Sequence, residues 1–139
     1  MIVLDTSVVV AALNGAEAEH APVRAWMEAN DEQFISTPLA ITEMDYLVGT
    51  HGGLAAAAAL WSELDAGAYL VEWWEDAMRE TVEAANRFAA LGIGLTDASL
   101  VALARQAGTT RIATLDHRHF RRLAPLTGEP GFVLLPADA

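Results

Sequence analysis

The chain has 139 residues, no cysteine, 53% hydrophobic residues and a mean hydropathy of +0.27, which excludes a disordered chain and any disulfide or thiolate site. Its eight basic residues are all arginines, so functions that need lysine, such as a phosphate-binding loop or a Schiff base, are excluded. The formal charge of -11 favours a basic partner, or metal ions held by clustered acids. We expect one domain over residues 1–139 with no signal peptide or membrane helix, and therefore a cytoplasmic protein.

Short apolar runs rich in β-branched residues alternate with helical patterns along the chain. Strands are expected at Ile2–Leu4, Gln33–Ser36, Tyr69–Glu72, Arg111–Leu115 and Phe132–Leu135. Helices are expected at Ser7–Leu13, Ala21–Ala29, Pro38–Val48, Leu54–Asp65, Glu75–Leu91 and Asp97–Ala107, with a short one after Asp116. Because apolar strands separated by helices are typical of a sheet covered on both faces, the pattern predicts a three-layer α/β/α sandwich with about five mostly parallel strands.

Two acids directly follow predicted strands. Asp5 ends the first strand and Asp116 ends the fourth. Because the carboxyl ends of parallel strands meet at one edge of a sheet, both acids are expected there. Each of them could instead simply cap the short helix that follows, since Asp accepts hydrogen bonds from first-turn N–H groups.

The helix expected from Asp97 has an acid within its apolar stripe. Asp97 shares a face with residues three, four and seven positions later, namely Leu100, Val101 and Ala104. Ser99 marks the opposite face, which we expect to be exposed to solvent. A carboxylate that faces a core is costly unless it is paired or binds a metal. The alternative is an ordinary first-turn acid stabilised by the helix dipole.

The helix expected from Pro38 carries two acids, Glu43 and Asp45, one at each edge of its buried stripe. Periodicity does not choose between them. Carboxylates at strand ends and helix starts make a hard-oxygen site, and such ligands suit Mg²⁺ or Mn²⁺.

Four segments in order resemble the PIN-domain ribonucleases, and most closely the VapC toxins of bacterial toxin–antitoxin pairs. These are Leu4-Asp5-Thr6-Ser7, Glu43, Leu95-Thr96-Asp97-Ala98 and Thr114-Leu115-Asp116-His117-Arg118-His119-Phe120. The resemblance spans Met1 to about Pro136 and implies a PIN-like fold. It also places Glu43, rather than Asp45, in the acidic cluster.

The resemblance implies a metal-dependent endoribonuclease toxin that is neutralised by a cognate, VapB-like antitoxin and commonly forms homodimers. Asp5, Glu43, Asp97 and Asp116 would hold one or two Mg²⁺ or Mn²⁺ ions, which activate a water molecule against the RNA phosphodiester. Hydroxyls beside them are expected to orient these ligands, namely Thr6, Ser7 and Thr114. Some PIN proteins carry a further acid where this chain has Arg118 and His119, which leaves the second ion open.

The segment from Arg105 to Arg122 holds five arginines and one acid, a charge of +4 in an acidic protein. A basic strip beside a metal site suits a nuclease, because it can hold backbone phosphates. The candidates for substrate binding are Arg118, Arg121 and Arg122, whereas Arg105 and Arg111 could merely be solvated. For His117 and His119, surface or substrate contacts are favoured over metal binding.

Apolar side chains on the two helices after Pro38 could form a surface for a protein partner. Leu39, Tyr46, Leu60 and Trp61 are the candidates, and an edge of the core is the alternative.

Two other functions are alternatives for the acids. A phosphatase with Asp5 as nucleophile needs a second Asp two residues on, where this chain has Ser7, and a lysine. The remaining alternative is a non-catalytic acidic PIN-like binding module for a basic protein partner. The expected core-facing position of Asp97 argues against it, since acids that only attract a partner need no burial.

Overall fold

The computed structural model describes residues 1–139, as five strands, six α-helices and one 3₁₀ turn. The strands are β1 (Ile2–Leu4), β2 (Phe34–Ser36), β3 (Tyr69–Val71), β4 (Arg111–Ala113) and β5 (Val133–Leu135). The helices are α1 (Thr6–Leu13), α2 (His20–Ala29), α3 (Pro38–Asp65), α4 (Ala77–Arg87), α5 (Leu95–Ala107) and α6 (His117–Phe120), with the 3₁₀ turn η1 at Ala89–Leu91. None of the helices combines the length and the apolar character that crossing a membrane requires.

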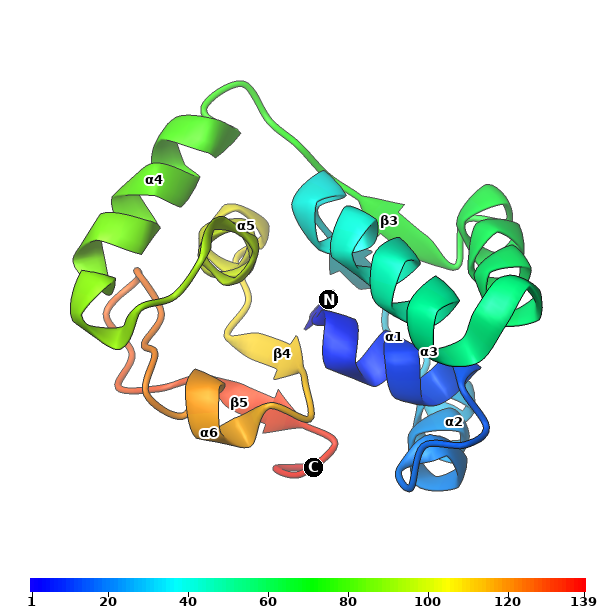
Figure 1. The fold of residues 1–139 in the computed structure, drawn as a ribbon. Helices are drawn as coiled ribbons and strands as arrows, with labels where there is room; N and C mark the ends of the chain where they lie inside the picture. Colours follow the sequence, from blue (N-terminus) through cyan, green and yellow to red (C-terminus); the bar gives the residue numbers. More distant parts are fainter.

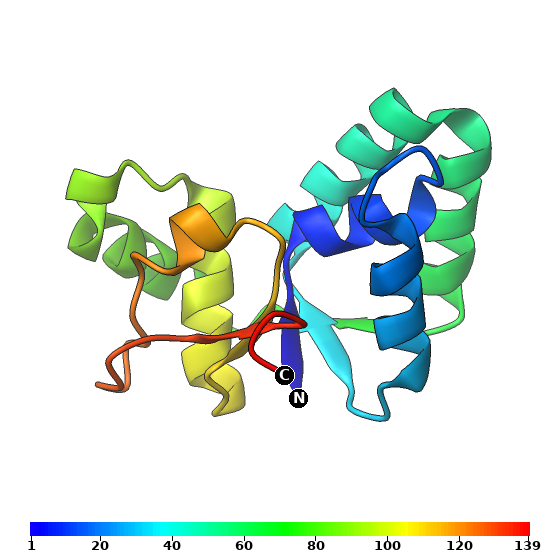
Figure 2. The same cartoon turned by 90° about the horizontal axis from the view of Figure 1, so that it is seen from below.

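The five strands form one sheet in the order β3-β2-β1-β4-β5, and every neighbouring pair is parallel. The sheet lies between helical layers, with α1, α2 and the second half of α3 on one side and α4 and α5 on the other (Figures 1 and 2). The predicted three-layer α/β/α class is therefore confirmed. The N-terminal strand β1 lies in the centre, where Val3 pairs with Ile35 of β2 and Ile112 of β4.

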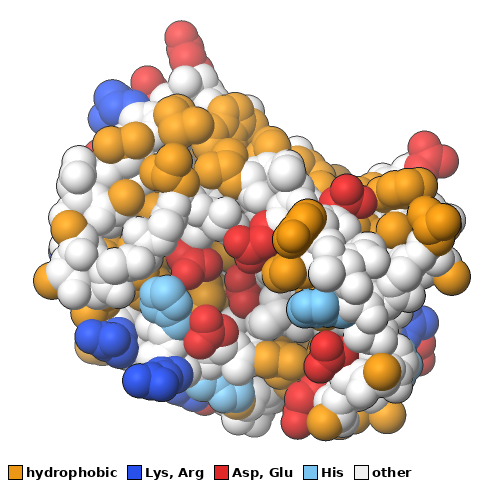
Figure 3. All heavy atoms as spheres, viewed as in Figure 1, with side chains coloured by type: hydrophobic (Ala, Val, Ile, Leu, Met, Phe, Trp, Pro, Cys, Tyr) orange, Lys and Arg blue, Asp and Glu red, His pale blue; other side chains and the backbone are white.

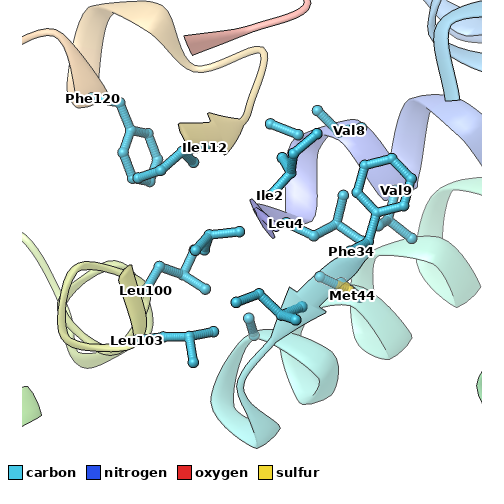
Figure 4. Close-up of a cluster of buried hydrophobic side chains, with 14 of the residues drawn as sticks. Ile2, Leu4, Val8, Val9, Phe34, Met44, Leu100, Leu103, Ile112 and Phe120 are labelled. Atoms are coloured by element: carbon cyan, nitrogen blue, oxygen red, sulfur yellow. The ribbon is translucent and has the colours of Figure 1, made fainter. Parts of the chain in front are cut away.

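The core is one continuous cluster of buried side chains that converge on β1 (Figure 4). Ile2, Leu4, Met44 of α3 and Leu100 of α5 belong to this cluster, and all four are fully buried. Helix α5 is buried on every side from Ala98 to Ala104, because it packs between the sheet, α3 and α4.

The expectation that Ser99 faces solvent was wrong, since its side chain is fully buried in this packing. Its hydroxyl donates to the Thr96 carbonyl oxygen at 2.6 Å and lies 2.7 Å from Thr37 Oγ1. A buried hydroxyl is tolerated here because it has hydrogen-bond partners. On a helix that is surrounded by protein, a polar residue does not indicate a solvent-exposed face.

The two helices expected at Pro38–Val48 and Leu54–Asp65 are the halves of α3, which bends sharply at Gly53. Gly53 has φ 77° and ψ -171°, a conformation essentially reserved for glycine. At Gly52 a Cβ would lie 2.7 Å from Cβ of Ala56, so the halves approach more closely than a side chain would allow. Trp61 Nε1 donates to Asp45 Oδ1 at 2.6 Å and joins the two halves.

Of the two interpretations for Leu60, an exposed patch and an edge of the core, the second is correct, because Leu60 is fully buried. The bend at Gly53 folds the second half of α3 back onto the core, so that Leu60 points inward. Tyr46 and Trp61 remain 69% and 53% exposed, and Leu39 is partly buried.

Replacing Gly53 by alanine forces a Cβ into a left-handed extended conformation. We expect Gly53→Ala to lower the free energy of unfolding by about 1–3 kcal/mol. Gly15→Ala is the matched control, because Gly15 has no positive φ and no atom within 4 Å of the added Cβ. Denaturant unfolding monitored by circular dichroism measures both variants. Equal stability of the two would contradict a strained bend at Gly53.

Candidate functional site

The carboxyl ends of β1 and β4 carry Asp5 and Asp116, as predicted, and their parallel pairing brings both acids to one edge of the sheet. Asp5 is only 5% exposed. Its Oδ2 accepts hydrogen bonds from Ser7 Oγ at 2.6 Å and from Thr114 Oγ1 at 2.8 Å. A buried carboxylate requires such donors, because an unpaired buried charge is costly.

The same hydroxyls also bind the backbone after β4. Ser7 Oγ accepts from the N–H of Leu115, and Thr114 Oγ1 accepts from the N–H of Asp116, both at 2.9 Å. The end of β1 is therefore tied to the end of β4 through side chains as well as through the sheet. Thr6 differs from these two residues, because its hydroxyl is buried and has no hydrogen-bond partner.

All four predicted acids line a single cavity of about 430 Å³ at this edge, together with Thr6 and Ser7. Figure 3 looks onto this face and shows acidic side chains gathered around a hollow at its centre, with a histidine beside them. No three Asp, Glu or His side chains converge closely enough to enclose a metal ion as they stand. The acids therefore face a common space without closing on one point.

The electrostatics of this cavity are dominated by burial and by repulsion between the acids. Burial and the neighbouring Asp5 raise the pKa of Asp97 to about 6; His119 opposes this shift, and Glu43 and Asp116 add to it. Burial also raises the pKa of Asp5, although the hydrogen bonds from Ser7 and Thr114 work against the shift. A divalent cation would relieve this repulsion, and a set of carboxylate oxygens fits a hard ion such as Mg²⁺ or Mn²⁺.

Glu43, and not Asp45, reaches the cavity. Glu43 lines the cavity wall, whereas the Asp45 carboxylate faces away and accepts from Trp61. The hydrogen bond between Thr37 and Ser99 joins the N-cap of α3 to the first turns of α5. It thereby holds together the two helices that supply Glu43 and Asp97.

His119 is the residue that sequence reasoning left without a defined role beside the acids. Its Nδ1 lies 3.5 Å from Oδ2 of Asp97 and 3.5 Å from Oδ2 of Asp116. Asp116 caps α6 by accepting from the His119 N–H at 3.2 Å, so the capping interpretation of Asp116 is also correct. The contact between His119 and Asp116 could have been predicted, because residues three apart on a helix are neighbours. The contact with Asp97 had no signal in the sequence.

The cavity also has lining residues that the sequence did not suggest. Glu17 and Glu19, from the segment between α1 and α2, line it, and so does His51 near the bend of α3. A further cavity of about 440 Å³ contains none of the predicted residues; it is lined in part by Phe34 and Tyr69.

The arginines of the segment from Arg105 to Arg122 do not form one continuous basic surface, because three of them are paired with acids. Arg105 pairs with Glu80 and Glu83 of α4, and Arg111 pairs with Glu32. Arg121 binds both carboxylate oxygens of Asp138 at 2.7 and 2.5 Å and lines no cavity.

Arg118 and Arg122 are the two arginines of this segment that the structure brings close to the acids. They line a cavity of about 260 Å³ together with Leu91, His119 and Asp116. Asp116 also lines the acidic cavity, so the two cavities adjoin.

Comparisons with known proteins agree with this fold. The profile of the PIN domain matches residues 2–126. Ribonuclease VapC26 of Mycobacterium tuberculosis (strain ATCC 25618 / H37Rv) is 33% identical over 128 residues, which cover 91% of this chain and 95% of that protein. The chain therefore belongs to the PIN-domain family and, within it, to the VapC ribonuclease toxins.

Two solved structures share the fold. VapC20 of Mycobacterium tuberculosis, described as a Sarcin-Ricin loop cleaving toxin, superposes with a TM-score of 0.74 at 21% identity, over 81% of this chain and 87% of that chain. FitAcB from Neisseria gonorrhoeae superposes with a TM-score of 0.62 at 24% identity, over 86% of this chain and 91% of that chain. At these identities the two structures support the fold alone.

The raised pKa of Asp97 predicts how stability depends on pH without metal ions. Ionising Asp97 is harder in the folded protein, so stability is lost as the pH rises from its ordinary pKa near 4 to about 6 and stays constant above that. In chelator at pH 7, Asp97→Asn should therefore be more stable than the wild type, by about 2 kcal/mol, and the difference should vanish near pH 4. Denaturant unfolding across this range measures it.

Asp31→Asn is the control for this experiment, because Asp31 is exposed and its carboxylate forms no ion pair or hydrogen bond. Its stability difference from the wild type should not change between pH 4 and pH 7. A difference for Asp97→Asn that is equally flat would contradict the raised pKa.

Proposed function

We propose that this VapC toxin is a Mg²⁺- or Mn²⁺-dependent endoribonuclease, with Asp5, Glu43, Asp97 and Asp116 as its metal-binding and catalytic residues. The observation that carries the proposal is that all four carboxylates line one cavity, where burial and the other three acids raise the pKa of Asp97. Perturbed acids in a cleft are typical of functional sites. The ribonuclease relative VapC26 supports RNA as the substrate.

The protein positions these acids in two different ways. Asp5 is rigid, because Ser7 and Thr114 fix its carboxylate and bind the chain after β4. Glu43 and Asp97 extend from helices that are joined through Thr37 and Ser99. When bound, one or two divalent ions would supply positive charge to the scissile phosphate and lower the pKa of the attacking water.

The contacts of each hydroxyl group indicate its role in the site. Ser7 and Thr114 orient Asp5, as ligand-orienting groups do in metal sites. Thr6 also lines the cavity, but its buried hydroxyl has no hydrogen-bond partner within the protein, so no contact assigns it to an acid. His119 offers a cationic or donor group between Asp97 and Asp116, at the place where some PIN proteins carry a further acid.

We also propose a protein partner of the antitoxin type and a homodimer. The outer surface of α3 supports a partner surface, because Tyr46 and Trp61 remain largely exposed although both are large and apolar. This surface lies on the helix that carries Glu43, so a partner bound there would be close to the cavity. A basic partner would suit a protein with a formal charge of -11.

The second candidate function is a non-catalytic acidic binding module for a basic protein partner. The charge of the whole chain favours it. The cavity does not, because Asp5 is almost fully buried and held by two hydroxyl donors. A carboxylate that only attracts a partner needs neither burial nor fixed orientation.

The purified protein, free of any co-expressed partner, should cut total bacterial RNA at a few sites in Mg²⁺ or Mn²⁺ and not in chelator. Asp97→Asn should lose at least a hundredfold in rate, because it removes a carboxylate from the cluster that binds the metal ion. Mapping the new 5′ ends measures both effects. Total RNA presents transfer, ribosomal and messenger RNA together, so the map identifies the target as well.

The same two proteins distinguish metal binding from cutting. Mn²⁺ should raise the unfolding midpoint of the wild type and leave that of Asp97→Asn unchanged, since a ligand stabilises only the state that binds it. Identical RNA ends from wild type and variant would refute the nuclease. If Mn²⁺ still stabilised the wild type in that case, a metal-binding but non-catalytic module would remain.

A further inference from the structure

Eight arginines face nineteen acids in this chain, and most of the arginines are already paired within the protein. Five of them lie within 4 Å of a carboxylate, namely Arg24, Arg79, Arg105, Arg111 and Arg121. Arg87 has no such pair and lies over the ring of Phe88, at 6.0 Å from its centroid. Only Arg118 and Arg122 combine an unpaired guanidinium with a position in a cavity.

An unpaired arginine in so acidic a protein is informative. The guanidinium groups of Arg118 and Arg122 have carboxylates within the same domain to pair with, yet the fold leaves both exposed beside a cavity. Arginine is the side chain best matched to phosphate, because its planar fork donates two parallel hydrogen bonds. The cavity of about 260 Å³ also offers Leu91 as an apolar wall.

The surroundings of the acidic cavity are asymmetric in charge. On one side it adjoins the cavity of Arg118 and Arg122 through Asp116. Its lining also includes Glu17 and Glu19, which belong to the segment between α1 and α2. Figures 1 and 2 place α6 and this segment on opposite sides of the carboxyl edge of the sheet. A phosphate is attracted on the first side and repelled on the second.

We propose that Arg118 and Arg122 form a phosphate subsite for a nucleotide next to the cut, so that the RNA backbone is held on one side of the scissile bond only. The proposal rests on the proposed ribonuclease function for the position of the cut. The side lined by Glu17 and Glu19 makes no phosphate contact. Specificity on that side then depends on base or shape, because charge provides no attraction there.

The first test measures binding and does not depend on cleavage. A short fluorescein-labelled single-stranded RNA is titrated with Asp97→Asn protein in chelator at several salt concentrations, and fluorescence anisotropy gives Kd. When Arg118→Gln and Arg122→Gln are added, the salt dependence of log Kd should become shallower by about 0.7 for each phosphate that the protein no longer neutralises. Undetectable binding at low salt before these changes, or an unchanged slope after them, would overturn the subsite.

Two control variants remove the same charge elsewhere. The first is Arg121→Gln: Arg121 is close to Arg118 and Arg122 in the sequence, but its guanidinium is bound to Asp138. The second is Arg79→Gln: Arg79 lies on α4 and pairs with Asp76, Glu80 and Glu83. Both should leave the slope unchanged. If either control variant made the salt dependence of log Kd as shallow as Arg118→Gln and Arg122→Gln do, net charge, and not a subsite, would be what attracts RNA.

The second test locates the phosphate subsite relative to the cut. Once a cleaved RNA is mapped, each flanking phosphate is replaced in turn by an uncharged methylphosphonate, and kcat/KM is measured. The wild type should lose tenfold or more on one side only, and the loss should disappear in the Arg118→Gln and Arg122→Gln protein, since both changes remove one interaction. Equal losses on both sides would overturn one-sided binding of the backbone, whereas absence of cleavage would count against the proposed function and leave the binding result intact.

Discussion

The arrangement of this site depends on one buried carboxylate and the two hydroxyls that satisfy it. Asp5 is almost inaccessible to solvent at the end of the central strand, and it is tolerated there because Ser7 and Thr114 donate to it. Those hydroxyls also accept from the backbone after β4, so the carboxylate is part of the joint between two strands. The same joint determines where Asp116 emerges. The same hydrogen bonds therefore stabilise this edge of the sheet and position Asp5 and Asp116.

A consequence is that the site is rigid at one end and adjustable at the other. Asp5 is fixed by its two hydroxyl partners, which are themselves hydrogen-bonded to the backbone. Glu43 and Asp97 instead line the cavity without hydrogen bonds to a protein donor, and burial together with repulsion from the other acids raises the pKa of Asp97. An ion could draw these two inward while Asp5 stays in place, because side chains that repel one another gain most when a cation arrives.

The predictable part of the molecule was the part determined by local periodicity and by sheet geometry. All five strands lie within the expected segments, and the positions of Asp5 and Asp116 followed from parallel pairing alone. Glu43 was different, because periodicity left it equivalent to Asp45 and only the resemblance selected it. The structure shows the physical reason for the choice, since Asp45 is engaged by Trp61 on the outer surface.

The failures share a cause, which is that they depend on partners far away in the sequence. Ser99 was expected to face solvent because it is polar, but Thr37 lies across from it. Leu60 was left open between an exposed patch and an edge of the core, because the expected break between the two helices did not indicate the direction in which the second one returns. The basic segment suggested three substrate arginines, and no local pattern indicated that Asp138 engages Arg121. Charge counts along a chain cannot show which cations the fold has already neutralised.

The central position of β1 affects when the site first exists during synthesis. β1 is translated first, yet one of its two neighbours is β4, whose pairing requires residues 111–113. Until then Asp5 lacks Thr114, and Asp116 has not been made. A ribosome therefore carries a growing chain whose acids are unassembled for most of translation, and the carboxylates gather only near its end. With the proposed carboxylate site, cutting of RNA therefore cannot begin until the chain is almost complete.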